Sequence, residues 1–238
     1  MPTLSVVIPA YNEERFIGTL LERVAAVDLS RRGVALEIVV VDDCSTDRTA
    51  GIAAAVPGVT LLRQAKNAGK GAAVRAGIER ATGDFVIIQD ADLEYDPNDY
   101  VPMLDALLDH GVDVVYGSRY MRRPGAGVLA TGRHPGQSWP AFLGGRSLSV
   151  ACWLCTGRYL TDTVTALKLF RGEAIRSVAL ETSGFELDHE ISAKMLAQGR
   201  RIVEVPIRYF PRSKAEGKKI GARDWFIAVA TFRRFRRG

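Results

Sequence analysis

Residues 85–94 read FVIIQDADLE, an apolar run followed by two aspartates that flank one small residue. An unbroken apolar run indicates a strand buried on both faces, as in a parallel sheet covered by helices on each side. The acidic pair would then project beyond the carboxyl end of the strand, where open α/β sheets bind their ligands. This stretch predicts both the layered fold and the position of its site.

The sequence on either side of this stretch alternates between strand and helix. Apolar strands are expected at residues 4–8, 36–41, 59–62 and 112–116, and helices at 14–27, 47–55, 70–81 and 97–108. Strands that alternate with helices predict a mainly parallel, Rossmann-like α/β sheet with helices on both faces. The strands at 4–8, 36–41 and 85–88 are each followed by polar residues, which would gather at one edge.

The later part of the chain departs from this alternation. Residues 119–160 hold a Gly/Pro/Arg loop and an apolar stretch expected to be a helix at 139–155; helical segments and a strand near 202–209 follow. We expect one domain over 1–238, with 119–160 as an insertion for an acceptor or a membrane interface. Residues 222–238 would form a basic amphipathic C-terminal helix.

Charge is concentrated toward the C-terminus. From Arg200 onward there are 12 Lys and Arg against three Asp and Glu, which indicates an anionic partner: phosphate, a membrane or nucleic acid. Nucleic acid is not expected, because neither base-stacking aromatic residues nor a recognition helix is evident. No stretch reaches the roughly 18–20 uninterrupted apolar residues of a spanning helix. The start MPTLSVVIPAYNEE reads as a strand rather than a signal peptide, so a cytoplasmic location is expected.

Asp90 and Asp92 are the strongest candidates for a metal site. Two adjacent carboxylates repel each other unless a cation neutralises them, and oxygen ligands suit Mg²⁺ or Mn²⁺. Glu94 would be a further oxygen ligand. The pattern predicts a divalent cation bound together with substrate phosphates.

Other polar residues at the same edge suit a nucleotide. Asp42 and Asp43 follow a strand, where one could cap the next helix while the other accepts hydrogen bonds from a base or ribose. Glu13 could act likewise, with Tyr11 packing on the base. Lys70 stands between glycines at a helix start, which suits an anion, although the segment matches neither the Walker pattern nor GxGxxG.

Five motifs in order carry a family resemblance: VVIPAYNEE, VVVDDCSTD, NAGKGAAVRAG, QDADLEYDP and YGSRY. Together they resemble the inverting GT-A glycosyltransferases of family 2. The later segments LTDTVTALKLF, FELDHEI and VEVPIRYFPRSKAEGKK are similar to the dolichyl-phosphate mannose and glucose synthase branch of that family. Cys44 departs from the pattern, since glycine is common there.

The resemblance implies a GT-A fold and a role for each matching position. The implied nucleoside site is Pro9, Tyr11, Glu13, Val41 and Asp43. The implied metal and diphosphate site is Asp90, Ala91, Asp92 and Glu94, and the residues implied to contact the donor phosphates or sugar are Arg119, Arg212 and Lys218. Asp92 and Arg119 would act at the leaving group, and Arg146 would bind the acceptor phosphate.

The implied reaction moves mannose or glucose from a GDP- or UDP-sugar to a polyprenyl or dolichyl phosphate. Such an acceptor is already ionised, whereas a sugar hydroxyl would need a base such as Asp162, Asp188 or Glu190. A family 2 enzyme acting on a hydroxyl is the first alternative. A sugar-phosphate nucleotidyltransferase and a basic membrane-binding module without activity are the others.

A peripheral position on the cytoplasmic face of a membrane is expected. The helices at 139–155 and near the C-terminus would lie on the surface, because aromatic amphipathic faces suit interfacial docking. The aromatic residues expected to enter the interface are Trp139, Phe142, Trp153 and Trp225. The arginines expected to face anionic lipid are Arg233, Arg234, Arg236 and Arg237.

Overall fold

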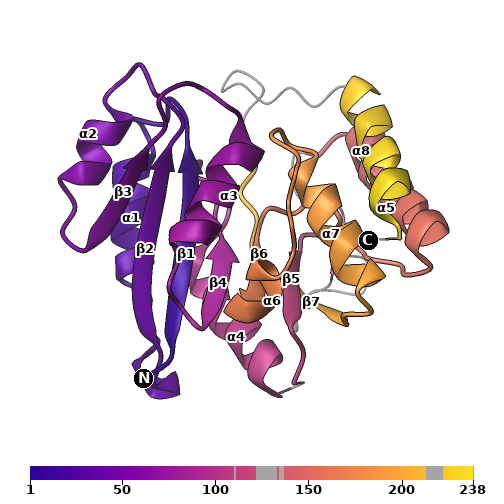
Figure 1. Ribbon diagram of the computed structural model, residues 1–238, viewed down its shortest axis with the longest axis horizontal. Coiled ribbons are helices and arrows are strands. Elements are labelled where there is room, and N and C mark those ends of the chain that lie inside the picture. Colours follow the sequence, from indigo (N-terminus) through magenta and orange to yellow (C-terminus); the bar gives the residue numbers. More distant parts are fainter. Residues whose placement is uncertain (110, 122–132, 134–136, 213–221, 238) are drawn as a thin grey trace.

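A seven-stranded sheet forms the centre of the molecule in the computed structural model, which describes residues 1–109, 111–121, 133, 137–212 and 222–237 (Figure 1). The strand order is β3-β2-β1-β4-β6-β5-β7. The strands are β1 (Thr3–Ala10), β2 (Ala35–Asp42), β3 (Val59–Arg63), β4 (Phe85–Ile88), β5 (Val114–Ser118), β6 (Lys168–Arg171) and β7 (Ile202–Pro206). The α-helices are α1 (Ile17–Ala25), α2 (Thr49–Ala54), α3 (Lys70–Arg80), α4 (Tyr100–Asp109), α5 (Trp139–Thr156), α6 (Gly172–Arg176), α7 (Leu187–Ala197) and α8 (Ala222–Phe235), with short 3₁₀ turns at Ser30–Arg32 and Pro97–Asp99.

Alternate residues of the central strands face two different hydrophobic layers. In β1, Leu4, Val6 and Ile8 pack with α1 and α4, whereas Val7 points to the layer that contains α3 and α7. Both sets are completely buried because helices cover each face of the sheet. The prediction of a mainly parallel sheet with helices on both faces is confirmed.

Strand β6 is the main feature that the sequence did not reveal. Among the strands that the structure describes, β6 alone runs antiparallel, and it lies between β4 and β5. The segment was expected to be helical. Its four residues carry too weak a pattern to predict a strand, and the hydrogen-bond ladders with two neighbouring strands stabilise it instead.

Helices α5 and α8 lie side by side at one end of the sheet (Figure 1). Ser138 caps the start of α5, and Gly157, in the left-handed conformation at φ 74°, ends it. Trp225 of α8 donates a hydrogen bond from Nε1 to Ser147 Oγ of α5 at 2.8 Å. Helix α8 therefore uses its aromatic face largely for packing.

His189 of α7 lies under α8, with its ring 5.0 Å from that of Phe232. Burial lowers the pKa of His189 to about 4. The folded chain therefore keeps this histidine neutral, whereas the unfolded chain protonates it below its ordinary pKa of about 6.5. Its contribution to stability is present above about pH 6.5 and is lost as the pH falls toward 4.

We expect the free energy of unfolding to fall by up to about 3 kcal/mol between pH 7 and pH 4 because of His189 alone. Urea unfolding of the wild type and of His189→Gln over this pH range measures the contribution of His189. It is the difference between the two proteins in the slope of the unfolding free energy against pH. An identical pH dependence in the two proteins would contradict the assignment.

Candidate active site

The carboxyl ends of β1, β2 and β4 bring three polar clusters to one edge of the sheet. These strands are parallel neighbours, with Pro9 paired to Val41 and Val7 paired to Ile88. The segments that follow them contain Glu13, Asp43 and Asp90. The predicted gathering of acidic residues at this edge is therefore what the topology produces.

A chain of alternating charges runs inward from Asp90. Lys70 Nζ, at the start of α3, lies 2.7 Å from Asp90 Oδ1 and 3.6 Å from Asp188 Oδ2. Asp188 Oδ1 in turn lies 2.5 Å from Lys168 Nζ, which is completely buried. Burial alone would lower the pKa of Lys70, but the two carboxylates raise it above its ordinary value. Lys70 is thus a firmly protonated cation beside Asp90.

Strand β6 explains how Lys168 reaches this edge. Because β6 is antiparallel, its first residue pairs with Ile88 at the end of β4 and with Tyr116 in β5. Sequence reasoning missed Lys168 as a site residue. The available signal was a lysine inside the apolar run ALKLF, since a lysine is almost never fully buried without a partner.

Asp92 is paired with Arg212 from the segment after β7. Arg212 Nη2 lies 2.9 Å from Asp92 Oδ2, and Arg212 Nη1 lies 3.4 Å from Glu13. Burial, together with the charges of Asp90 and Glu94, raises the pKa of Asp92 to about 7, although Arg212 opposes this. Arg212 Nε is buried without a hydrogen-bond partner in the described part of the chain. The carboxylates of Asp90, Asp92 and Glu94 therefore still repel one another although Arg212 is present.

Glu94 is bound by the segment that follows β7. Its carboxylate accepts hydrogen bonds from Tyr209 Oη at 2.5 Å and from the backbone N–H of Arg212 at 2.8 Å. Leu93, at φ 60°, turns the chain between Asp92 and Glu94. Within the described ranges, no group of three or more His, Cys, Asp or Glu side chains is arranged to hold a metal. The expected trio of Asp90, Asp92 and Glu94 is not assembled, and Glu94 anchors the 209–212 segment instead.

Asp43 holds the loop that leads into α3. Its two carboxylate oxygens accept hydrogen bonds from the backbone N–H groups of Ala68 and Gly69, each at 2.8 Å. Gly69 has φ 93°, and a Cβ there would lie 2.5 Å from the carbonyl oxygen of Ser183, so only glycine fits. Asp42 is fully buried and accepts from Ser45 N–H and from Arg63. Asp42 thus holds the loop after β2, and Asp43 holds the loop that leads into α3.

The remaining predicted nucleoside residues differ in exposure. Pro9, Val41 and Ala91 are buried in or beside the sheet, which leaves only their backbone for a ligand. Tyr11 is 46% exposed at the end of β1, where its ring is open to solvent. Cys44 has φ 63°, a left-handed conformation that glycine adopts at lower cost than cysteine.

Arg119, directly after β5, is bound to Asp162. Its Nε and Nη2 donate to the two carboxylate oxygens at 2.7 and 2.8 Å, and the guanidinium lies 5.0 Å from the ring centre of Tyr209. The backbone of Thr161 and Asp162 is held by Glu204 of β7. This pairing of Arg119 with Asp162 was not predicted.

Arg146 of α5 lies near Arg119. The ring of Tyr120 is 5.7 Å from the guanidinium carbon of Arg119 and 5.9 Å from that of Arg146. Arg146 Nη1 donates to the carbonyl of Thr161 at 3.2 Å, and none of the described carboxylates pairs with it. Lys218, the other predicted cation of this region, lies outside the described residues.

One face of α5 is exposed and apolar. Residues separated by three or four positions share this face, and its exposed members are Trp139, Leu143, Val150, Trp153 and Leu154. Arg146 follows the same spacing and lies among them. Phe142 instead packs on Tyr120, and Trp225 binds Ser147, so these two expected interface residues make internal contacts. Arg233 and Arg234 are exposed on α8, Arg236 and Arg237 are exposed directly after it, and Arg234 is paired to Glu181.

In the part of the chain that the structure describes, no helix combines the length and apolar character needed to cross a membrane.

Comparison with known proteins identifies the family. The model of the family described as Glycosyl transferase family 2 matches residues 5–176, which is more than half of the chain. The chain belongs to glycosyl transferase family 2. The resemblance drawn from the five motifs is confirmed.

Two individual relatives are similar to nearly the whole of this chain. The chain is 32% identical over 229 residues to dolichol-phosphate mannosyltransferase from Pyrococcus furiosus, covering 92% of this chain and 59% of that protein. It is 34% identical over 223 residues to undecaprenyl-phosphate 4-deoxy-4-formamido-L-arabinose transferase from Edwardsiella ictaluri, covering 90% of this chain and 62% of that protein. The chain thus spans less than two thirds of the length of these relatives.

A solved structure confirms the GT-A fold. Glucosyl-3-phosphoglycerate synthase from Mycobacterium tuberculosis, in complex with Mn²⁺, UDP and glucosyl-3-phosphoglycerate, superposes with a TM-score of 0.64 at 22% identity. The match covers 90% of this chain and 74% of that one.

Asp188 should be essential to the stability of this edge. Asp188→Asn would leave Lys168 and Lys70 without their shared carboxylate in a buried setting, which typically costs about 3–5 kcal/mol. Asp113→Asn is the matched control, because its partners Arg171 and Arg200 are at the surface and its loss should cost about 1 kcal/mol or less. Urea unfolding of both variants checks the difference, and similar small losses would contradict it.

Proposed function

We propose that this chain is an inverting glycosyltransferase that moves a hexose, mannose or glucose, from a GDP- or UDP-sugar to a polyprenyl phosphate. The choice of acceptor is supported by one observation in particular. Every carboxylate considered as a base for a hydroxyl acceptor is already bound by cations or backbone donors, while Arg146 offers a guanidinium without a carboxylate partner among the described residues.

The three candidate bases are held in different ways. Asp162 forms a two-pronged pair with Arg119, and Asp188 lies between Lys168 and Lys70. Burial alone would raise the pKa of Asp188, but the two lysines bring it below its ordinary value, which makes it a weak base. Glu190 is fully buried and accepts hydrogen bonds from the backbone of Glu181 and Thr182. An acceptor that is already ionised needs none of them.

A phosphate monoester meets this requirement, because its second pKa is about 6. Its oxygen attacks the anomeric carbon as the bond from that carbon to the diphosphate oxygen breaks, and the electron pair leaves with the nucleoside diphosphate. One attack from the opposite side inverts the anomeric centre, and no proton has to be removed. The names of the relatives from Pyrococcus furiosus and Edwardsiella ictaluri each include a polyprenyl-type phosphate, which agrees with the proposed acceptor.

Asp90 and Asp92 fit a divalent cation. Their oxygen donors suit Mg²⁺ or Mn²⁺, and the raised pKa of Asp92 indicates an unrelieved excess of negative charge that a cation would remove. Mg²⁺ is usually held by one or two carboxylates plus substrate phosphates, so the absence of Glu94 from the set is no obstacle. When bound, the metal would stabilise the charge that develops on the leaving diphosphate. The neighbour with Mn²⁺ and UDP supports this use.

The chain's own cations would complete the donor site. Arg212 lies against Asp92 and Lys70 lies against Asp90, so both cations are placed to contact donor phosphates. Arg119 and Lys218 are proposed for the same role. Cationic groups fixed before the reaction stabilise developing charge without reorganising. The proposed nucleoside site uses Pro9, Tyr11, Glu13, Val41, Asp42, Asp43 and Ala91.

The site would work at the surface of a membrane, on its cytoplasmic face. The exposed apolar face of α5 carries Arg146 in its middle, so a polyprenyl tail could lie along that face while its phosphate meets the guanidinium. Exposed Trp139 and Trp153 suit the membrane interface, and the arginines of α8 suit anionic lipid.

Asp92→Asn should reduce transfer at saturating donor by at least about hundredfold, because a carboxylate at the charge-developing centre is lost. The fold should persist, since neutralising Asp92 relieves a buried, repelled carboxylate. Transfer is measured with radiolabelled nucleotide sugar, and thermal unfolding controls for stability. Wild-type turnover in the variant would exclude Asp92 from the site.

Arg146→Ala should raise the acceptor KM or lower kcat by about tenfold or more, with little change in donor affinity, because a guanidinium binds phosphate through two parallel hydrogen bonds. Arg146→Lys should recover only part of the loss, since the ammonium is a point charge. The assay compares polyprenyl phosphate with a sugar hydroxyl acceptor. Unchanged acceptor kinetics would refute the role of Arg146, and transfer to the hydroxyl alone would overturn the proposed substrate class.

A further inference from the structure

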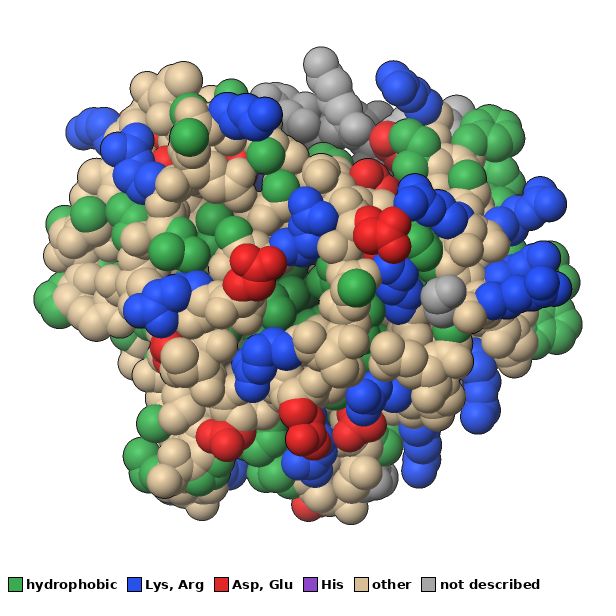
Figure 2. Space-filling model, viewed as in Figure 1, with side chains coloured by type: hydrophobic (Ala, Val, Ile, Leu, Met, Phe, Trp, Pro, Cys, Tyr) green, Lys and Arg blue, Asp and Glu red, His purple; other side chains and the backbone are tan. Residues whose placement is uncertain are grey.

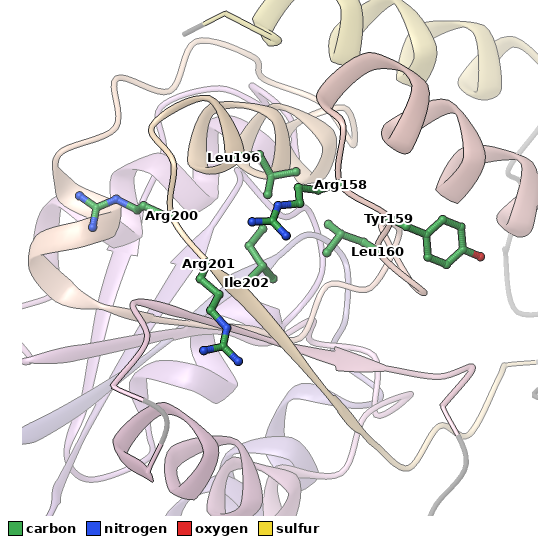
Figure 3. Close-up of a pocket in the computed structure, with 7 residues that line it drawn as sticks. All are labelled: Arg158, Tyr159, Leu160, Leu196, Arg200, Arg201 and Ile202. Atoms are coloured by element: carbon green, nitrogen blue, oxygen red, sulfur yellow. The ribbon is translucent and has the colours of Figure 1, made fainter.

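A cationic cavity lies near the amino-terminal ends of β5 and β7, away from the carboxyl edge that carries Asp90 and Asp92. It has a volume of about 210 Å³ and lies between the segment after α5, the end of α7 and the start of β7 (Figure 3). Ile202 of β7 pairs with Val114 at the start of β5, whereas Arg119 follows the other end of β5. The cationic and aliphatic residues that line this cavity are Arg158, Arg200, Arg201, Leu160, Leu196 and Ile202.

The charges of this cavity are not balanced. Arg200 is paired with Asp113, its Nη1 lying 2.6 Å from the carboxylate. Arg158 and Arg201 are exposed, and no carboxylate in the described ranges pairs with either. Figure 3 shows Arg158 near Leu196 and Ile202, while the Tyr159 side chain extends away from the cavity. Two arginines beside an apolar floor fit an anion attached to an apolar group.

Helix α5 connects this cavity to the proposed acceptor site. Its 18 residues span about 27 Å, with Arg146 in the first half and Arg158 just beyond the C-terminal Gly157. The exposed face that contains Leu143 and Val150 ends at Trp153 and Leu154, immediately before the cavity. Arg158 is exposed as well and follows Leu154 by four residues, after the turn at Gly157. Figure 2 shows that lysines and arginines are also numerous at this end of the molecule, around α8.

We propose that this cavity binds the phosphate headgroup of an anionic phospholipid and fixes the angle at which α5 lies on the membrane. Arginine is suited to phosphate because its planar fork donates two parallel hydrogen bonds. The cavity is smaller than the roughly 300–1,000 Å³ of sites for drug-sized ligands, so it suits a headgroup rather than a nucleotide sugar. The inference rests on the proposed function only in taking the acceptor to be a membrane lipid.

The test is sedimentation of the full chain with vesicles of phosphatidylcholine, with and without phosphatidylglycerol, in the absence of donor and acceptor. The variant is Arg158→Gln/Arg201→Gln. The control is Arg23→Gln/Arg31→Gln, which removes the same charge from exposed arginines near α1. We expect the first variant to bind phosphatidylglycerol vesicles about thirtyfold more weakly than the control, since it removes two basic residues from the proposed contact with the anionic surface. Equal binding by the two variants would overturn the proposal.

Soluble ligands identify the source of the phosphate. Monomeric dihexanoyl phosphatidylglycerol should bind the wild type and not the Arg158→Gln/Arg201→Gln variant, and inorganic phosphate should bind more weakly than this lipid. Equally tight binding of inorganic phosphate would assign the cavity to a free anion and contradict the lipid assignment.

Enzyme assays separate this inference from the proposed function. Transfer to a detergent-solubilised polyprenyl phosphate should be unchanged in the Arg158→Gln/Arg201→Gln variant, because neither residue belongs to the proposed active site. Absence of transfer in the wild type with intact lipid binding would refute the proposed function alone. Loss of transfer in this variant, with its fold retained, would contradict a purely lipid-binding role.

Discussion

The parallel strands gather negative charge at the carboxyl edge of the sheet, and cations from distant parts of the chain must balance this charge for the fold to be stable. The parallel strands bring Asp90, Asp92 and Glu13 together, and like charges in a partly buried setting destabilise one another. Lys70 and Arg212 reduce this repulsion from opposite sides, one from the start of α3 and one from the segment after β7. The site therefore ties together parts of the chain that are far apart in sequence. It also retains a need for positive charge, shown by the raised pKa of Asp92, which a metal bound with diphosphate would satisfy.

The antiparallel strand β6 extends this charge balance toward the acceptor side. It places Lys168 behind Asp188, so that Asp188 is held between two ammonium groups. Asp162 is held just as firmly by Arg119. Carboxylates committed in this way position neighbouring groups and are poorly suited to remove a proton. Arg146 has no such carboxylate partner among the described residues, and the ring of Tyr120 lies 5.7 Å from the guanidinium carbon of Arg119 and 5.9 Å from that of Arg146. In the proposed function, Arg146 is the cation that receives the acceptor phosphate.

The fold was largely predictable because its signals are local. Buried strands such as 85–88 are continuous apolar runs, and the helices between them follow a regular spacing, so strand-helix alternation predicts the parallel sheet. The motifs also predicted that the acidic residues after β1, β2 and β4 gather at one edge of the sheet, as the strand order requires. Partnerships between distant residues were not predictable: Glu94 turns to Tyr209, Arg119 binds Asp162, and Trp225 packs on Ser147. Strand β6 was missed since its stability comes from its neighbours in the sheet rather than from its own four residues.

The central claim is that the edge around Asp90 and Asp92 binds a nucleoside diphosphate through a divalent cation. Thermal unfolding with GDP or UDP, each with Mn²⁺ and with a chelator, tests it most directly, because a ligand that binds only the folded chain raises its Tm. We expect a rise in Tm with one of these nucleotides that requires Mn²⁺ and disappears in Asp90→Asn. A rise of equal size in the chelator, or an undiminished rise in Asp90→Asn, would contradict it.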